Sequence, residues 1–410
     1  MKRYQKTAIS QYLLVGLILL AILGFGLLIS ITMQKVSFDD YFILPWSAGR
    51  TWLLEASDPY GSISQNTQEV IRSGEYFAKQ PSQEILLLPL FNLLLYLPFS
   101  LIPYGISRIL WVTLLSIFSG GCVFLILRLS EWKLSLFERI LAIIFGVFWY
   151  PGAYTILSGQ LSPIILFIFL FAIVLLQNDQ DTTAGLLLSL TFGSLPMAVI
   201  FTIGMLIWTI SRRRWFVIIA YFSGVAFQIV ISILLMPNWI INWFNNIFSI
   251  YETIGWINTP LVSFAGLLPG ISNFLVIFLH IIIAIFLLFE IIMISRASGR
   301  VFIWRMFILL IISYFFHIQF SMAHLVLIIP GLFFVFRFMS ERWGGWGRIF
   351  SWILLSFIFI GSWLFFFPEN KFTVSNINSA LSIGLPVIVL IGLFYSRWWV
   401  HRIPKLDNRT

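Results

Sequence analysis

Apolar stretches of about 20 residues recur along this chain, and each is long enough to cross a lipid bilayer as a helix. Of the 410 residues, 60% are hydrophobic and only 10% are charged, whereas a soluble domain is about 25% charged. Inside a bilayer each segment must satisfy its own backbone hydrogen bonds, so helices are the expected spanning elements. The sequence therefore predicts an all-α polytopic membrane protein, organised as a single domain over residues 1–410.

The apolar pattern predicts about ten full spans and one broken pair of half-helices. The first run is too long for the core of a signal peptide and lacks a small-residue cleavage site, so we expect it to remain as span one. The half-helices fall between Asp181 and Arg212, where Ser194-Leu195-Pro196 interrupts a stretch too short for two crossings. The full spans are expected near residues 9–33, 105–127, 139–157, 162–177, 215–236, 272–295, 301–317, 321–339, 349–367 and 378–396.

Most of the 25 lysines and arginines fall on one side of these spans, together with both termini. The positive-inside rule assigns that side to the cytoplasm, so the net charge of +9 reports topology and no nucleic-acid partner is expected. Two longer segments then lie outside: residues 34–104, with membrane-lying helices, and residues 237–271, rich in aromatic residues that favour the lipid headgroups. The short cytoplasmic loops contain no GxGxxG or GxxxxGK[ST] motif, which argues against a cytoplasmic nucleotide sugar or ATP.

This topology requires that the apolar run 85–103 does not cross the bilayer. Pro89, Pro98 and Pro103 make the run a poor continuous helix, and we expect it to lie in or dip into the outer leaflet. The alternative is a true span, which would move the basic cluster between Arg128 and Arg139 to the outside.

Two adjacent carboxylates, Asp39 and Asp40, stand at the outer end of span one. A carboxylate in that position can take a proton from an incoming hydroxyl group. Neighbouring side chains of a helix point about 100° apart, so only one of the two can face a cavity. The alternative is that both merely mark the membrane edge, where a charge costs little.

The residues around this pair resemble a known family. An acidic residue at the end of span one, then Ala48-Gly49-Arg50, then Asp58-Pro59-Tyr60, is similar to the first-loop pattern of glycosyltransferase family 87. Members of that family have the GT-C fold and use sugars carried on polyprenyl phosphate. The segments LLLPLFNLLLYLPFSLIP, LSGQLSPIILFIFLF, GLLLSLTFGSLPMAVIF and FSMAHLVLIIP resemble its proline-containing segment, Gly-Gln motif, broken helix and late histidine segment, in the same order.

Two positions depart from the family pattern. Leu195 stands before the proline of the broken helix, where the family commonly carries a lysine, and Leu87 and Leu88 precede a single proline where it often reads Tyr-Pro-Pro. Both departures bear on the donor sugar and on the contacts to its phosphate.

The resemblance implies a membrane glycosyltransferase that moves a hexose or pentose from a polyprenyl-phosphate donor to a lipid or glycan acceptor, on the extracytoplasmic side of the cell membrane. Counting eight residues back from Ala48, as the family pattern does, selects Asp40 over Asp39 as the general base. Because a phosphate leaves readily, one carboxylate suffices, unlike the acid and base pair of a hydrolase. No cofactor is expected, and the four scattered histidines show no metal-binding spacing.

Three external cations in or beside the first loop are candidates for binding the donor phosphate: Arg50, Lys79 and Arg108. For each of them, pairing with a nearby glutamate on the surface is an equally good explanation. Arg108 is the strongest candidate, because it stands at the apolar start of a span, where an unpaired charge is costly.

Three uncharged or weakly basic residues complete the predicted substrate site. His324 lies at the outer mouth of its span and would bind phosphate or acceptor, unless it is a structural histidine with its own partners. Gln160 and Asn258 would line the cavity.

Two other functional classes stay open. A transporter or flippase of lipid-linked glycans usually needs inverted repeats or ionisable residues in several spans, and only His280 and Glu290 qualify. An O-antigen polymerase or ligase-like enzyme also acts on lipid-linked glycans. Such enzymes tend to have their large external loop late in the chain, whereas here it follows span one.

Overall fold

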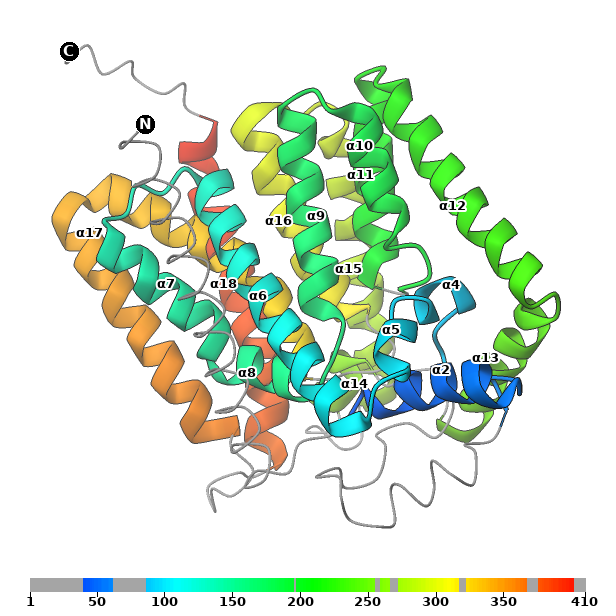
Figure 1. Ribbon diagram of the computed structural model, residues 1–410. Helices are drawn as coiled ribbons and strands as arrows, with labels where there is room; N and C mark the ends of the chain where they lie inside the picture. Colours follow the sequence, from blue (N-terminus) through cyan, green and yellow to red (C-terminus); the bar gives the residue numbers. More distant parts are fainter. Residues whose placement is uncertain are drawn as a thin grey trace, which may run out of the picture. The chain divides into compact units, whose positions relative to one another are not determined.

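The computed structural model describes residues 40–61, 86–194, 197–254, 259–265, 272–316, 322–366 and 375–401. The regular structure of these residues is helical, as the composition predicts (Figure 1). The elements are α2 (Ile43–Glu55), α4 (Leu90–Leu93), α5 (Leu97–Ser100), α6 (Tyr104–Ser130), α7 (Leu136–Phe148), α8 (Tyr150–Leu157), α9 (Ser162–Gln177), α10 (Asp181–Ser189), α11 (Met197–Ser211), α12 (Trp215–Leu235), α13 (Trp239–Ile254), α14 (Pro260–Ala265), α15 (Ser272–Ile294), α16 (Gly299–Phe315), the 3-10 helix η1 (Met322–Ile328), α17 (Ile329–Phe366) and α18 (Ser375–Val400).

The chain packs as two units. Among the described residues, unit 1 contains α2, α5, the part of α6 up to Ile117 and the short segment Ile156–Gln160. Unit 2 contains the rest of α6 and most of the remaining helices. The two units are described separately below.

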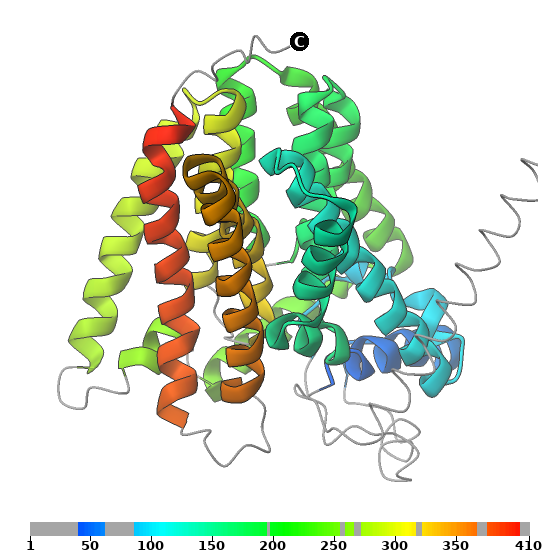
Figure 2. The ribbon, with the colours of Figure 1, turned by 90° about the vertical axis from the view of Figure 1, so that its left-hand side faces the viewer.

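Helix α16 is the centre of unit 2. Its residues from Phe302 to Phe315 are all buried, because α11, α15, α17, α18 and η1 pack against it. Two buried side chains of α16 form hydrogen bonds to the backbone of α18. Trp304 Nε1 donates to the carbonyl of Leu393, and the hydroxyl of Tyr314 donates to the carbonyl of Ser382, both at 2.8 Å. Helices α15 and α18 are neighbouring outer helices of this unit (Figure 2).

Five helices of the described chain are long and apolar enough to cross a membrane, and the pair α7 and α8 would make a sixth. All of them fall on predicted spans, and α9 occupies the predicted segment 162–177 as a shorter apolar helix. The predicted count of about ten crossings is not confirmed, and the first predicted span, 9–33, lies outside the described residues. The five are Tyr104–Ser130, Trp215–Leu235, Phe274–Ile294, Met322–Leu364 and Ser382–Val400.

The predicted span 139–157 is helical but is bent, so it is not one continuous helix. Helices α7 and α8 meet at an angle of 58°, and the residue between them, Trp149, is extended with φ −62° and ψ 151°. Pro151 explains the break, because a proline has no N–H to donate and is tolerated in the first turn of a helix rather than in its interior.

Helix α17 contains the two segments that the sequence predicts as separate spans. At Gly344 the backbone leaves the helical region, with φ 56° and ψ −131°. Beyond this point the chain turns back on itself, since Ser351 Oγ donates to the carbonyl of Phe336 at 3.4 Å. The positive φ suits glycine, which carries no Cβ.

Two predicted interruptions have distinct outcomes. The broken half-helix pair is confirmed: α10 (9 residues) and α11 (15 residues) are separate helices on either side of the predicted break, whose residues 195–196 lie outside the described chain. Residues 237–271, predicted as the second external loop, contain α13 and α14 in their described part, and their external placement remains a prediction.

The proline-rich run 85–103 contains no continuous helix in its described part. It forms α4 and α5, of four residues each, and then enters α6 directly after Pro103. A helix of four residues is far too short to cross a bilayer. The placement of this run at the outer leaflet remains a prediction.

That placement can be tested by cysteine labelling at Gly105, which is exposed near the start of α6. A Cβ at this position meets no atom within 4 Å, so Gly105→Cys should be tolerated. In a Cys122→Ala background, which removes the buried native thiol, we expect an impermeant thiol reagent to label intact cells. The matched control is Arg128→Cys, exposed near the other end of the helix, which should react only in opened cells. The reverse pattern would show that 85–103 is a span.

Candidate active site

Asp40 lies in front of α2, and only 1% of its surface is exposed. Its Oδ1 accepts hydrogen bonds from the backbone N–H groups of Phe42 (2.9 Å) and Ile43 (3.1 Å). The first N–H groups of a helix have no partner within the helix, and a negative charge there is favoured by the helix dipole. The N–H of Tyr41 donates to the carbonyl of Ser158 at 2.9 Å, which fixes the backbone on the other side of the carboxylate.

The second carboxylate oxygen, Oδ2, meets two side chains from the start of α6. Tyr104 donates its hydroxyl proton to Oδ2, and Nη1 of Arg108 forms an ion pair with the same oxygen. Nη1 also donates to the hydroxyl oxygen of Tyr104 at 2.6 Å, while Nη2 donates to the carbonyl of Leu157 at 2.9 Å. We call Asp40, Tyr104 and Arg108 the carboxylate cluster.

Aromatic rings enclose one side of this cluster. The ring of Phe42, which is fully buried, lies within 6.2 Å of the rings of Tyr96, Phe99, Tyr104 and Trp111, measured between centroids. Burial raises the pKa of Tyr96, so its phenol stays neutral. Because apolar walls exclude water, charges in the cluster interact more strongly than they would at a surface.

Arg108 carries an unused donor. Its side chain is 10% exposed, and Nε has no hydrogen-bond partner among the described residues. A buried donor without a partner costs about 1–3 kcal/mol, and a ligand oxygen would recover that cost. The guanidinium group can therefore take a further anionic partner such as a phosphate.

Two other predicted site residues, Arg50 and Gln160, lie in unit 1 together with the carboxylate cluster. Arg50 lies on α2 and donates weakly to the carbonyl of Ser100 (3.4 Å), with its guanidinium group 5.5 Å from the ring centre of Trp46. It is therefore held against α5 and is not a member of the carboxylate cluster. Gln160 is buried at the end of the segment whose carbonyl groups contact Tyr41 and Arg108.

The remaining candidates do not join this arrangement in the described residues. His324 is buried in η1, which belongs to unit 2. Asp39, Lys79 and Asn258 lie outside the described residues. In the described chain no group of three His, Cys, Asp or Glu side chains could hold a metal ion, and the sequence predicts no such site.

Sequence reasoning missed Tyr104, and it included Gly159 only as part of the Gly-Gln motif, without a role of its own. Tyr104 and Arg108 are four residues apart on a helix, and this spacing places both side chains on one face. Gly159 has φ +78°, its carbonyl accepts a hydrogen bond from Nε1 of Trp111 (2.9 Å), and a Cβ there would lie 2.9 Å from the Cβ of Phe42. Only glycine can bring this segment so close to the residues that follow Asp40.

Gly159→Ala should therefore destabilise the site, although glycine has no side chain that could take part in the reaction. We expect a loss of about 1–3 kcal/mol in stability, because the new side chain meets both an unfavourable φ and Phe42. Thermal denaturation of the detergent-purified protein measures it. Gly105→Ala is the matched control, since its Cβ meets nothing within 4 Å. Equal melting temperatures for the two variants would contradict the role given to Gly159.

Comparison with known proteins places the chain in a family. The model of glycosyltransferase family 87 matches residues 87–316, which is more than half of the chain and includes Tyr104, Arg108 and Leu157. Asp40 precedes the matched segment and His324 follows it. No curated protein matches the chain. With a family match of this extent and several helices able to cross a bilayer, the chain belongs to glycosyltransferase family 87 and is a membrane glycosyltransferase.

Proposed function

We propose that this enzyme transfers a hexose or pentose from a polyprenyl-phosphate donor to a lipid or glycan acceptor on the extracytoplasmic side of the membrane, with Asp40 as general base. The observation that carries the proposal is the carboxylate cluster, in which a buried carboxylate and a buried arginine with a spare donor lie together. One group can accept a proton, and the other can stabilise a departing phosphate.

The reaction is a single displacement. The acceptor hydroxyl oxygen attacks the anomeric carbon, and a new carbon–oxygen bond forms while the bond from that carbon to the phosphate oxygen breaks. The bonding electrons leave with the polyprenyl phosphate, whose negative charge grows as it departs. The hydroxyl proton passes to Asp40, which becomes neutral.

The contacts of Asp40 define what must change before the reaction. Oδ1 is occupied by two backbone N–H groups, and Oδ2 is occupied by Arg108 and Tyr104. A carboxylate stabilised in this way is a weak base, because its charged form is already satisfied. In the proposed cycle the donor phosphate draws Arg108 away from Oδ2, so that donor binding makes the base available to the acceptor hydroxyl.

Two points support the donor and the side of the membrane, and a third supports an enzyme. Asp40 follows the predicted first span, whose outer end the charge distribution assigns to the extracytoplasmic face. Nucleotide sugars are absent there, so a lipid-linked phosphate sugar is the expected donor. Family membership also favours an enzyme over the transporter or flippase that the sequence left open.

A double variant separates catalysis from a purely structural role of the cluster. Asp40→Asn alone leaves Arg108 buried without its counter-charge, which costs about 3–5 kcal/mol and can impair folding. In Asp40→Asn with Arg108→Gln both groups are neutral and can still hydrogen-bond. We expect this double variant to insert and melt like the parent, yet to transfer sugar at least about 10²-fold more slowly because it has no base.

The activity measurement uses purified protein, a polyprenyl-phosphate sugar and an acceptor extract, with Asp58→Asn as control. Asp58 is exposed and caps a turn by accepting a hydrogen bond from the N–H of Tyr60 (2.9 Å), a role that asparagine can keep. A folded double variant that retains most of its transfer activity would rule out Asp40 as the base.

Arg108 is tested by its effect on turnover. Arg108→Lys keeps the charge but loses the two-pronged geometry of the guanidinium group. We expect the decrease in kcat to be larger than the increase in KM for the acceptor, because the charge on the phosphate grows toward the transition state. Arg128→Gln removes an exposed arginine from the same helix and should change neither constant. Equal losses in the two variants would indicate a general charge effect and remove Arg108 from the site.

A further inference from the structure

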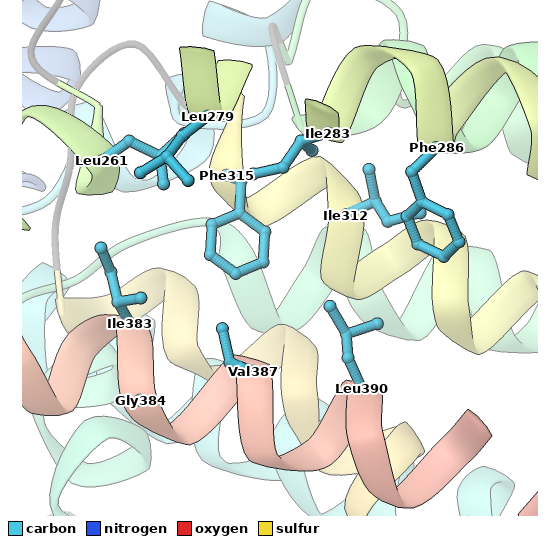
Figure 3. A pocket seen from close by; sticks show the side chains of 10 residues that line it. All are labelled: Leu261, Leu279, Ile283, Phe286, Ile312, Phe315, Ile383, Gly384, Val387 and Leu390. Carbon is cyan, nitrogen blue, oxygen red and sulfur yellow. The ribbon is translucent and has the colours of Figure 1, made fainter. Parts of the chain in front are cut away.

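Helix α18 takes part in two surface features of unit 2 that the proposed reaction does not use. Near its middle it forms a groove with α14, α15 and α16, lined by apolar side chains and one glycine (Figure 3). None of these side chains can form a hydrogen bond, so the groove lining selects no polar ligand. The last turn of α18 is different, because charged and aromatic side chains gather around it.

The arginines at this end of unit 2 fall into two groups. Arg342 and Arg397 are exposed, and neither forms an ion pair with a carboxylate of the described chain. Their charges are therefore available to an anion from outside the chain. The other group is already neutralised by ion pairs, which join Arg300 to Glu131, Arg337 to Glu341 and Arg348 to Glu138.

Each of the two available arginines lies against a tryptophan of α18. The Cζ atom of Arg342, in the turn of α17, is 4.5 Å from the ring centre of Trp399, and that of Arg397 is 5.0 Å from the ring centre of Trp398. The ring of Tyr395 lies 5.0 Å from that of Trp399, between centroids. We call these five residues the arginine–tryptophan surface. Figure 2 shows the turn of α17 and the end of α18 at the same end of unit 2.

This arrangement leaves the hydrogen-bonding edge of each guanidinium group free. A stacked ring covers one face of the planar group, whereas the N–H groups point outward in its plane. Such an edge matches the oxygens of a phosphate, which arginine commonly binds through two parallel hydrogen bonds. The arginine–tryptophan surface is therefore suited to a phosphate group.

The surroundings indicate that this phosphate belongs to a lipid. The surface is the last turn of Ser382–Val400, a segment apolar enough to cross a membrane. Trp398 is 65% exposed, and Trp346 in the turn of α17 is 81% exposed. Exposed tryptophans next to arginines favour the headgroup layer of a bilayer, and the charge distribution assigns this end of the spans to the cytoplasmic side. The anionic lipids of that leaflet attract arginine side chains.

We propose that the arginine–tryptophan surface binds the headgroup of an anionic phospholipid, such as phosphatidylglycerol, in the cytoplasmic leaflet. A zwitterionic headgroup carries its own cation, which offsets the attraction of its phosphate to arginine, so the surface prefers the anionic lipid. The inference does not depend on the proposed reaction, because none of the five residues has a part in it.

The test is photolabelling of the full-length protein in phosphatidylcholine nanodiscs that contain a trace of a diazirine lipid. The diazirine sits near the headgroup of either phosphatidylglycerol or phosphatidylcholine. We expect phosphatidylglycerol to label peptides from the α17 turn and the end of α18 at least about fivefold more strongly, roughly the contribution of one arginine near an anionic surface. The outward face of α15 should be labelled equally by both lipids, because its exposed residues, such as Ile281 and Leu288, are apolar.

A pair of double variants separates this surface from a general effect of charge. Arg342→Gln with Arg397→Gln should remove the preference for phosphatidylglycerol. Arg128→Gln with Arg213→Gln removes two other exposed arginines, neither of which stacks on a described ring, and should keep the preference. Arg397→Gln alone changes one exposed side chain and should lower the preference, whether or not the first double variant folds.

Three results would overturn the inference. One is equal labelling of the α17 turn and the end of α18 by the two lipids. Another is the same loss of preference in both double variants, which would show attraction by net charge alone. The third is suppression of labelling by inorganic phosphate but not by sodium chloride of equal ionic strength, which would show a site for the free anion.

Discussion

The ion pair between Asp40 and Arg108 is the interaction on which the organisation of unit 1 depends. Neither charge is tolerable alone in a buried position, and removal of one partner costs about 3–5 kcal/mol. The pair joins the start of α2 to the start of α6, and Arg108 extends the connection to the carbonyl of Leu157. In the proposed function, the contacts that hold these three segments together are thus the contacts that place a proton acceptor beside a phosphate-binding group.

The proposed dual use accounts for the contacts that occupy both oxygens of Asp40 before substrate arrives. An unpaired carboxylate in an aromatic pocket would become protonated or would destabilise the fold. Tyr104 reduces that problem, because its hydroxyl donates to Asp40 and accepts from Arg108. A donor phosphate that competes for Arg108 would release the carboxylate only when there is a sugar to transfer.

The sequence predicts the parts of this protein that are governed by local physics. The apolar run of residues 162–177 coincides with α9, and the break near Pro196 separates α10 from α11. The apolar pattern alone could not show the bend at Trp149, because apolar residues continue across it, and the signal in the sequence was Pro151. Residues 237–271 were predicted as an external segment whose aromatic residues favour the lipid headgroups, and α13 forms there with its polar and aromatic side chains on different faces.

In the site, too, the local sequence predicts some residues, whereas others depend on contacts between distant segments. Arg108 could be selected because it stands at the apolar start of a span, and the pair Asp39 and Asp40 because it stands at the outer end of span one. The choice of Asp40 over Asp39 depended on the family pattern. That Asp40 and Arg108 pair with each other depends on the approach of α2 to α6, for which neither local sequence carries a signal. Tyr104 was overlooked because a tyrosine at the start of an apolar helix is common, and only its spacing from Arg108 marks it. Asp39, Lys79 and Asn258 keep their sequence-based assignments as predictions.

The central claim is that the donor phosphate takes Arg108 from Asp40. The most direct measurement is an electron cryomicroscopy structure of the unsubstituted chain with an unreactive phosphonate analogue of a polyprenyl-phosphate sugar. The account predicts that the guanidinium group of Arg108 contacts the phosphonate, and that Oδ2 of Asp40 faces the anomeric carbon without its arginine partner. An analogue bound elsewhere, with the pair between Asp40 and Arg108 intact, would contradict it.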